Sequence, residues 1–332
     1  MAVTTSTTLS NTYRAYFSKK LLERAVQELR LNEFASEAEL PKNLGSKVIT
    51  FFRPAVAAAS NVVALTEGVA ISTFRDVTYT PVEATLAQYG EASKVTDVVT
   101  MTGLFDALKQ NIETMGDDCA LHADELTRAA CIHPTTGLTK MYAQGQASFA
   151  STIAASVTLT KLLGSDLLRA ATALKIARAP KIDGNYVAII PPQCSFDIMR
   201  DGDFLDTAKY SNSKALYKGE IGTLWGVRCV EATNPHQEDE TEGTYAAAFD
   251  AGGTNTLGLV YSTIVTGKGS YGVPKLAGTA SPWKPSVVIN DKADKSDPLN
   301  QYIIAAWKSY WTSLVLNRTF GITLRSRSAF VG

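Results

Sequence analysis

The clearest hydrophobic pattern in the chain lies between residues 101 and 133. Apolar or weakly polar positions recur there at alternating spacings of four and three residues, which places them on one face of an α-helix. These positions are Met101, Phe105, Leu108, Ile112, Met115, Cys119, His122, Leu126 and Ala129. Thr102 can cap the start of this helix, and Pro134 with Gly137 can end it. We therefore predict one helix over residues 102–133, on the order of 48 Å long.

Extended patterns precede this helix. Residues 47–53 (KVITFFR) and 76–95 (DVTYTPVEATLAQYGEASKV) predict two strands, and LTEG at 65–68 is a turn candidate between them. Pro81 makes the second strand an edge strand or a bent one. A two-stranded hairpin with a long loop has no obvious core of its own. We therefore expect it to lie on something outside itself.

The rest of the chain mixes short helices and strands, which predicts an α+β fold without internal repeats. The predicted helices are 13–31, 164–179 and 191–199. The predicted strands are 186–190, 226–230, 257–265, 271–276 and 284–289. The apolar segment 301–323 is expected to return the chain to the core, and residues 1–12 are expected to form an extended arm.

Composition narrows the classes of protein. Lys+Arg and Asp+Glu both number 32, so the net charge is near zero, which disfavours sequence-independent phosphate binding as the main activity. Only 19% of the residues are charged, as expected for a subunit that buries its flanks against neighbours. The start of the sequence is polar and no apolar run approaches 18 residues, so we expect neither a signal peptide nor a membrane span. The four cysteines are expected to be reduced.

A glycine-rich segment at residues 267–272, GKGSYG, matches the G-x-G-x-x-G pattern of dinucleotide-binding loops. That pattern needs a helix to begin at the loop, because the helix N-terminus receives the pyrophosphate. Here Pro274 follows and the strand pattern continues. The P-loop pattern fails as well, since Ser262 stands at its first glycine and Gly269 follows Lys268. We therefore interpret the segment as a β-turn.

Two cysteines and two histidines could be read as zinc ligands. They are Cys119, His122, Cys131 and His133. Along a helix, Cys119 and Cys131 would be about 18 Å apart, so one ion could reach both only if the helix broke between them. We interpret the cysteines as buried thiols and His122 as a core histidine, and we predict no metal site.

No other pattern indicates a catalytic centre or a cofactor site. The chain has no G-x-S-x-G elbow. An acidic cluster could bind calcium weakly, but it lacks the ligand spacing of an EF-hand, and we interpret it with His236 as part of a solvated loop over 235–256. Its members are Glu238, Asp239, Glu240 and Glu242. The aromatic residues Trp307, Tyr310 and Trp311 are interpreted as core.

Six segments spread over nearly the whole chain resemble the N4-gp56-like family of tailed-phage major capsid proteins, which are shell proteins with the HK97 fold. They are YFSKKLLERA (16–25), LPKNLGSKVITFFR (40–53), YVAIIPP (186–192), KALYKGEIGTLWGVRCVEATN (214–234), GKGSYGV (267–273) and DPLNQ (297–301). The segment between the predicted helix 102–133 and Ser165, and the loop 235–256, depart from the family pattern in length.

The resemblance implies a domain organisation in five parts. These are an N-terminal arm (1–46), a projecting E-loop hairpin (47–95), a peripheral domain with a long spine helix (96–164), an axial domain (165–296) and a return to the peripheral domain (297–332).

The resemblance also implies a function without enzymatic chemistry. The chain would assemble into hexamers and pentamers of an icosahedral head shell around double-stranded DNA, without sequence-specific binding and without a membrane. A portal and a separate scaffolding protein would be partners, and a decoration or cement protein is a further one that the family allows. Assembly would take place in the host cytoplasm, and the protein would reside in the virion.

Two other functions stay open. An encapsulin-like nanocompartment shell shares the fold but encloses an enzyme cargo. An α+β enzyme would need a pocket of titrating residues that the sequence does not indicate. For a shell protein, we predict the strongest contacts between subunits on the first E-loop strand and at its turn. The residues are Phe51, Phe52, Arg53, Thr66, Glu67 and Gly68.

Overall fold

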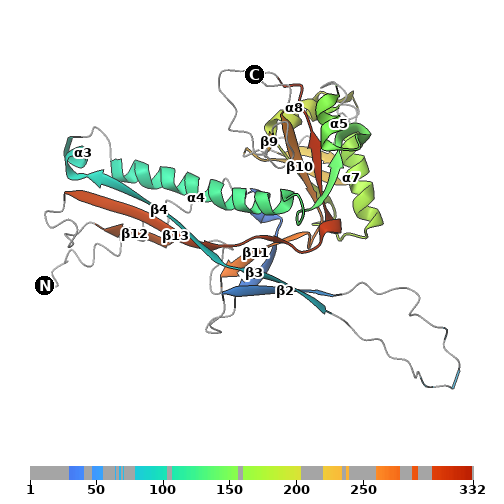
Figure 1. The fold of residues 1–332 in the computed structure, drawn as a ribbon, viewed down its shortest axis with the longest axis horizontal. Helices are drawn as coiled ribbons and strands as arrows, with labels where there is room; N and C mark the ends of the chain where they lie inside the picture. The colour runs from blue at the N-terminus through green and yellow to red at the C-terminus, as the bar shows by residue number, and fades with distance from the viewer. Residues whose placement is uncertain are drawn as a thin grey trace.

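The computed structural model shows an elongated part joined to a compact body (Figure 1). We call the elongated part the arm; it is distinct from the N-terminal arm predicted for residues 1–46. It describes residues 30–40, 47–54, 64, 67–68, 70, 79–102, 107–155, 160–202, 220–233, 237–238, 259–276, 286–290 and 301–330. The arm consists of one long helix over a sheet, the body is built on a larger sheet with short helices, and a hairpin projects from the place where they meet (Figure 1). The fold is therefore α+β, as the sequence predicts.

The arm is built from α4 (Ala107–Ile132) and an antiparallel sheet in the order β12–β13–β4. The strands are β12 (Ser286–Asn290), β13 (Tyr302–Trp311) and β4 (Ala87–Thr96). Ile112, Met115 and Cys119 of α4 are buried in one cluster with Trp307 and Trp311 of β13. The intervening Tyr310 is exposed, because successive side chains of a strand point to opposite faces. The core prediction is thus confirmed for the two tryptophans and wrong for Tyr310.

The long helix differs from its prediction in two respects. It begins at Ala107, and a separate short helix, α3 (Asp97–Thr102), precedes it, with residues 103–106 outside the described part of the chain. The predicted apolar stripe is wrong at both ends, since Met101 is 84% exposed and Ala129 is exposed as well.

The buried positions of α4 recur every four residues instead of alternately every four and three. They are Ile112, Met115, Gly116, Cys119, Ala120, Ala123, Asp124, Thr127, Arg128, Cys131 and Ile132. Four residues exceed one turn of 3.6, so the buried face rotates around the helix toward its C-terminal end. The cause is a change of neighbour: the first half of α4 packs on the β13 sheet, whereas Cys131 and Ile132 pack in a cluster with the body.

The short helix α2 (Arg30–Glu33) explains why polar residues of α4 are buried. The backbone N–H of Leu31 donates to Asp124 Oδ1 at 3.0 Å, and Thr127 Oγ1 donates to Asn32 Oδ1 at 2.9 Å. Tyr271 donates its hydroxyl to Leu31 O at 2.5 Å. These bonds anchor the segment around Leu31 to α4 and to Tyr271. Most of the predicted helix 13–31 lies outside the described residues.

The body is built on a seven-stranded sheet in the order β5–β15–β10–β6–β8–β7, with β9 paired to β10. The strands are β5 (Thr139–Tyr142), β15 (Gly321–Ser326), β10 (Val260–Thr266), β6 (Tyr186–Ile190), β8 (Val227–Glu231), β7 (Glu220–Leu224) and β9 (Gln237–Glu238). The helices are α5 (Phe149–Ala154), α7 (Gly164–Ile176) and α8 (Pro192–Met199), and short 3₁₀ turns are η2 (Ala143–Gly145) and η4 (Arg318–Phe320).

Both faces of the large sheet are covered, which explains the continuous apolar run YVAII of β6. Tyr186, Ala188 and Ile190 belong to a cluster with α7 and α8, whereas Val187 and Ile189 belong to the cluster with the C-terminal end of α4. All five side chains are buried. The predicted strand 186–190 is confirmed, and α7 and α8 match their predicted helices to within a few residues.

A three-stranded sheet lies between arm and body, in the order β1–β11–β14. It comprises β1 (Ser36–Leu40), β11 (Tyr271–Leu276) and β14 (Leu314–Val315). The predicted segment 301–323 therefore divides among three sheets, because β13, β14 and the start of β15 each pair with different partners. Among the described helices, none is long and apolar enough to cross a membrane.

Candidate assembly surfaces

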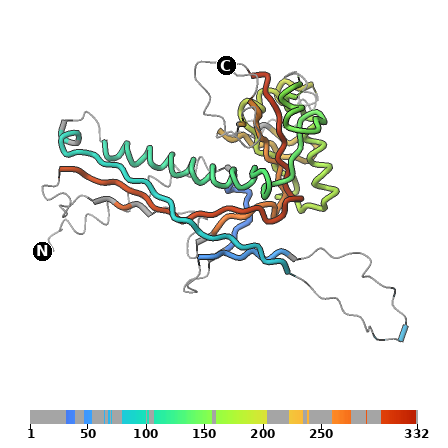
Figure 2. Tube along the Cα trace, in the orientation of Figure 1, coloured from blue at the N-terminus to red at the C-terminus, as the bar shows by residue number. Residues whose placement is uncertain are grey.

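The projecting hairpin consists of β2 (Val48–Pro54) and β3 (Tyr79–Thr85), paired in register from Val48 with Thr85 to Pro54 with Tyr79. β3 continues into β4 after one residue, so the predicted strand 76–95 is two strands that pair with different partners. In the Cα trace, β3 follows the line of β4 and carries the hairpin away from both arm and body (Figure 2).

One face of the hairpin packs on its own subunit. Phe51 is only 8% exposed, and Leu316 O accepts a hydrogen bond from Arg53 Nη1 at 3.1 Å. A Cβ atom built on Gly272 of β11 would lie 2.7 Å from Phe51 Cε1, so the phenyl ring lies directly against the glycine backbone. Of the predicted assembly residues, Phe51 and Arg53 therefore fix the base of the hairpin to β11 and the segment after β14.

The other face of the hairpin is open. Phe52 is 70% exposed and Tyr79 is 58% exposed. Phe52 stands opposite Pro81, and Tyr79 lies two residues from Pro81 on the same strand, so all three share one face of the ribbon. The sequence predicts Phe52 as an assembly residue but not Tyr79, although an aromatic residue two positions before Pro81 was a signal for it.

The predicted turn of the hairpin is described only in part. Glu67 and Gly68 are exposed in a turn, where Gly68 has a φ of 79° that favours glycine. Thr66 lies outside the described residues. Of the predicted assembly residues that the structure describes, Phe51 and Arg53 contact their own subunit, whereas Phe52 and the turn residues Glu67 and Gly68 are exposed.

Adding a methyl group at Gly272, beneath the Phe51 ring, should loosen the hairpin base. We expect Gly272→Ala to lower the free energy of unfolding by about 1–3 kcal/mol, because the new methyl group overlaps the phenyl ring. Urea denaturation followed by circular dichroism measures this loss. Gly202→Ala is the matched control, since its Cβ would meet no atom within 4 Å. Adding Phe51→Leu to Gly272→Ala should recover part of the lost stability, because the smaller side chain relieves the overlap. If the losses of the two single variants simply add in the double variant, the contact between the two residues is contradicted.

A second exposed apolar group lies at the far end of the arm. Val98, Val99 and Met101 of α3 are all exposed. α3 follows β4 directly and lies at the end of the arm opposite the body (Figure 1). The sequence predicts Met101 as the first position of the apolar stripe and makes no prediction for Val98 and Val99.

The glycine-rich segment forms a turn between two sheets. It connects β10 with β11, and Gly269 has a φ of 80°. The backbone N–H of Gly267 donates to Phe320 O, and that of Lys268 donates to Pro180 O, both at 2.9 Å. Ser270 O accepts from Leu316 and Asn317. A strand follows the turn instead of a helix, so the turn interpretation is confirmed.

The two cysteines of the zinc hypothesis lie in different parts of the molecule. Cys119 and Cys131 are buried in different hydrophobic clusters, and burial raises the pKa of both thiols well above its ordinary value. His122 packs edge-on against Tyr89 with ring centroids 5.0 Å apart. His133 Nδ1 accepts from the backbone of Thr136 at 3.2 Å. Within the described parts of the chain, no group of three or more His, Cys, Asp or Glu side chains could hold a metal ion.

One residue of the acidic loop contradicts the prediction that the loop is solvated. Glu238 is buried and forms an ion pair with Arg325 of β15, which is fully buried. The prediction of a solvated loop is therefore wrong for Glu238, because β9 places it beside β10 in the large sheet. Asp239, Glu240, Glu242 and His236 lie outside the described residues.

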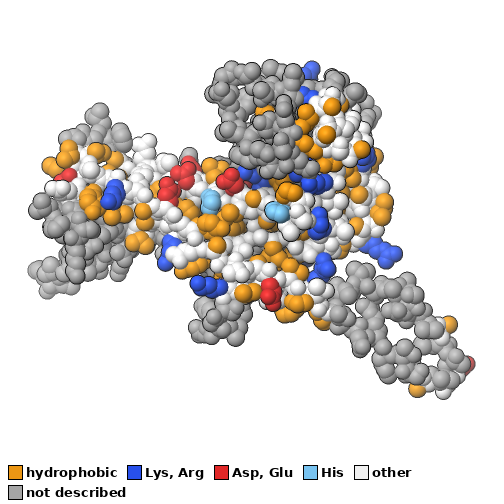
Figure 3. Space-filling model, in the orientation of Figure 1, with side chains coloured by type: hydrophobic (Ala, Val, Ile, Leu, Met, Phe, Trp, Pro, Cys, Tyr) orange, Lys and Arg blue, Asp and Glu red, His pale blue; other side chains and the backbone are white. Residues whose placement is uncertain are grey.

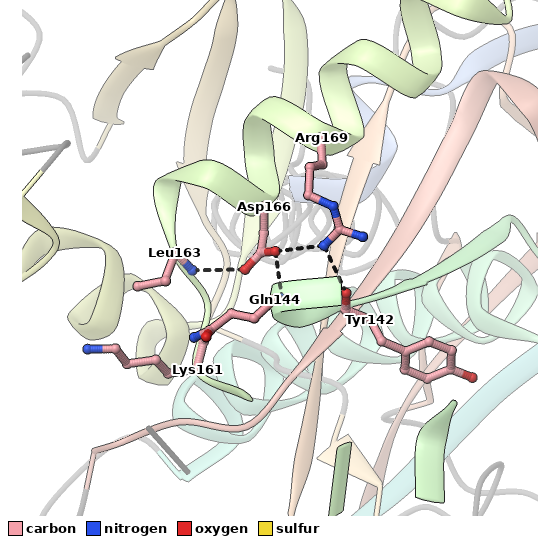
Figure 4. A network of polar contacts seen from close by, with 6 residues as sticks. All are labelled: Tyr142, Gln144, Lys161, Leu163, Asp166 and Arg169. Carbon is pink, nitrogen blue, oxygen red and sulfur yellow. Dashed lines mark hydrogen bonds and ion pairs between the residues drawn. The ribbon is translucent and has the colours of Figure 1, made fainter. Parts of the chain in front are cut away.

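A buried carboxylate ties α7 to η2 (Figure 4). Asp166 is fully buried and accepts three hydrogen bonds: from Gln144 N at 2.7 Å, from Leu163 N at 3.3 Å and from Arg169 Nη1 at 3.0 Å. Burial raises the pKa of Asp166, and these hydrogen bonds offset the increase only in part. Arg169 also reaches Tyr142 O at 3.4 Å. The three donors hold the carboxylate of Asp166 in place. None of the six residues in this group forms the pair of nucleophile and base that covalent catalysis requires.

The raised pKa of Asp166 predicts a pH dependence. The folded state takes up a proton at higher pH than the unfolded chain, where Asp titrates near about 3.9. The contribution of this carboxyl to stability is therefore highest below that value and falls as pH rises toward the raised folded pKa. The difference in unfolding free energy between wild type and Asp166→Asn should fall over this window in urea titrations at several pH values. A difference that rises with pH would contradict the prediction, and the exposed Asp183→Asn controls for lost charge.

Comparison with known proteins finds likeness at the level of structure. No protein-family model and no curated protein sequence matches the chain. Among solved structures, the capsid of Ralstonia phage GP4 is 12% identical with a TM-score of 0.64, and the match covers 90% of this chain and 91% of that one. The capsid of cyanophage P-SCSP1u is 16% identical with a TM-score of 0.60 over 89% and 87%.

A third match comes from a different kind of particle. A virus-like particle from Pyrococcus furiosus is 11% identical, with a TM-score of 0.50 over 94% of this chain and 99% of that one. All three matches span nearly the full length of both chains. The likeness therefore concerns the whole arrangement of arm, body and hairpin.

Proposed function

We propose, from the HK97-like capsid fold that this chain shares with those subunits, that it is the major capsid protein of a tailed bacteriophage. In this role it would assemble into the icosahedral head shell that encloses the double-stranded DNA genome. The observation that carries the proposal is the match to phage capsid subunits over about nine tenths of both chains. The finer assignment to the N4-gp56-like family rests on the sequence segments alone.

The exposed hairpin supports an assembly role. Phe52 and Tyr79 expose large apolar side chains on a ribbon that projects from the subunit, and such groups are commonly buried against a partner. The base of the same ribbon is fixed by Phe51 and Arg53, which would hold the exposed face at a defined angle. We accordingly assign residues 47–95 as the E-loop. Among its described residues, we expect Phe52 to contribute most to contacts with a neighbouring subunit, and we expect further contacts from Glu67 and Gly68 at the turn.

The remaining parts follow the same assignment. Residues 1–46 would be the N-terminal arm, 96–164 and 297–332 the peripheral domain with α4 as its spine, and 165–296 the axial domain. Hexamers and pentamers would form the shell, with a portal and a separate scaffolding protein as partners and a decoration or cement protein as a further one. Assembly would occur in the host cytoplasm, and the mature protein would reside in the virion. The role is structural, without catalysis.

An encapsulin-like nanocompartment shell is the second candidate, because one of the matches is to a virus-like particle and not to a phage capsid. Electron microscopy of the purified, overexpressed protein, with and without its neighbouring gene products, tests both. We expect closed shells or rings of pentamers and hexamers. Nucleic acid inside them would support the phage head, whereas an enzyme inside would support the nanocompartment. A monodisperse monomer or dimer under every assembly condition would overturn both.

A further inference from the structure

Three loops meet at the end of the seven-stranded sheet where β10 ends and β15 begins. The hydrogen bond from Lys268 N to Pro180 O, at 2.9 Å, holds the turn after β10 against the loop after α7. The bond from Gly267 N to Phe320 O, also at 2.9 Å, holds η4 beside the same turn. A Cβ atom built on Gly267 would lie 2.7 Å from Pro180 O, so the two backbones are in close contact there. These contacts fix the three loops relative to one another.

The three loops carry four exposed cations, which we call the basic cluster. They are Arg178, Lys181, Lys268 and Arg318. Among the described residues, none of the four forms an ion pair with a carboxylate. Arg318 Nε donates to Gly137 O at 2.8 Å, and Lys181 Nζ lies 5.9 Å from the centroid of the Tyr186 ring. Neither contact neutralises the positive charge of its side chain.

The loops themselves supply little compensating negative charge. Segments 177–185, 267–270 and 316–320 carry the basic cluster and contain one acidic residue, Asp183. Segment 133–140, which borders the cluster through Gly137, contains no acidic residue. The cluster is therefore a local concentration of positive charge in a chain whose net charge is near zero.

The acidic side chains of α4 do not compensate the cluster either. Acidic side chains lie along α4, whereas Lys and Arg gather where α4 meets the body (Figure 3). Glu125 is paired with Arg128 of the same helix at 3.3 Å. Asp118 lies about 21 Å along the helix axis from Ile132, the last residue of α4, which is about two Debye lengths at 0.1 M salt. The charge of Asp118 is thus screened from the cluster.

We infer that the basic cluster binds the phosphate backbone of the double-stranded DNA that the shell encloses. The inference rests on the proposed function and names one binding site within it. Lys and Arg side chains contact phosphate oxygens without reading the bases, so the site accepts DNA of any sequence. The basic cluster then faces the interior of the shell, which gives the orientation of the body relative to the enclosed genome.

The surroundings of the cluster favour duplex DNA over a single strand. Proteins that bind single strands use exposed aromatic rings on which successive bases stack. The aromatic residues beside the cluster, Tyr186 and Phe320, instead pack in or against the hydrophobic core of the body. Duplex DNA needs no such rings, because its phosphates present one negative charge per about 1.7 Å of helix axis. It is also the polyanion that the proposed function brings to every subunit.

The salt dependence of DNA binding tests the site. The full-length chain is titrated onto a fluorescent duplex of random sequence at NaCl concentrations from about 50 to about 200 mM, with the protein kept below the concentration at which sedimentation detects shells. Each lost phosphate contact should flatten the slope of log K against log salt concentration by about 0.9. We expect Arg178→Gln with Lys268→Gln to flatten the slope by about 1.8 and to weaken binding at low salt by about ten-fold.

Two further variants control for lost charge and for altered structure. Lys94→Gln with Lys308→Gln removes two exposed cations from the arm, each of which lies beside a tyrosine ring, and should leave the slope unchanged. Arg178→Lys with Lys268→Arg keeps both charges of the cluster and should retain binding close to that of the wild type. Circular dichroism and urea denaturation check that every variant is folded.

The outcomes separate this site from the proposed function. Absence of duplex binding by the wild type overturns the site, and so does a wild-type slope after Arg178→Gln with Lys268→Gln. An equal loss in the arm control also overturns it, because the effect then follows net charge. Binding of polyglutamate in place of the duplex overturns it as well and identifies an acidic protein segment as the partner. Absence of shells from the wild type contradicts the proposed function instead, while the titration still decides the DNA site.

Discussion

Replacing residues 60–72 at the end of the hairpin with a short Gly-Ser linker is expected to leave a folded subunit that assembles poorly. The ladder from Val48–Thr85 to Pro54–Tyr79 lies outside the deleted segment, and so do the contacts of Phe51 and Arg53 that fix its base. The deletion therefore spares the described core. Shell yield should fall by about ten-fold or more, because each subunit loses one of its several contacts and the loss recurs throughout the shell. Electron microscopy and sedimentation measure the yield.

A milder variant tests the same surface without shortening the chain. Phe52→Ser with Tyr79→Ser removes the exposed aromatic face and should lower the yield less than the deletion does. Val288→Ser is the matched control, since it removes an exposed apolar side chain from β12, away from the hairpin. Circular dichroism should give the same folded signal for all variants. Unchanged shell yield after the deletion would remove the E-loop assignment.

The sequence correctly predicts elements that keep the same packing environment along their whole length, either because both faces are buried or because one face is buried throughout. β6 is an example: five apolar residues bounded by Asn185 and Pro191 form a strand that is buried on both sides. The hairpin strand β2 is another, because KVITFFR combines β-branched and aromatic residues. In such cases local composition and tertiary environment favour the same structure.

The prediction fails where the environment changes along one element. The stripe on α4 follows a constant helical period, but the neighbours of α4 change from the β13 sheet to α2 and the body. Burial of Asp124 depends on the backbone of Leu31, which lies 93 residues away in the sequence. Contacts of this kind have no local signature. Of the predicted assembly residues, Phe52 is exposed, as a contact with a neighbour requires, whereas the inward position of Phe51 depends on Gly272 of a distant strand.

The buried pair Glu238–Arg325 has the largest expected effect on stability. Glu238 lies on the two-residue strand β9 and Arg325 on β15, on either side of β10, and their side chains are 1% and 0% exposed. The guanidinium also lies over the ring of Phe149, 5.8 Å from its centroid. Removing the carboxylate would leave this charge in the interior without its acidic partner, which costs far more than an exposed ion pair contributes. We expect Glu238→Ala to lower the free energy of unfolding by about 3–5 kcal/mol, measured by urea denaturation.

The reason for this cost can be tested by removing both charges. Glu238→Leu combined with Arg325→Met places apolar side chains of similar volume in the same site, and we expect it to recover most of the stability lost in Glu238→Ala. Recovery would show that the loss arises from an isolated buried charge. If the double variant is as unstable as Glu238→Ala, the loss arises instead from packing around β9. An acidic residue in a segment that sequence predicts to be solvated thus fixes the start of that segment to the large sheet, because its positive partner is already buried there.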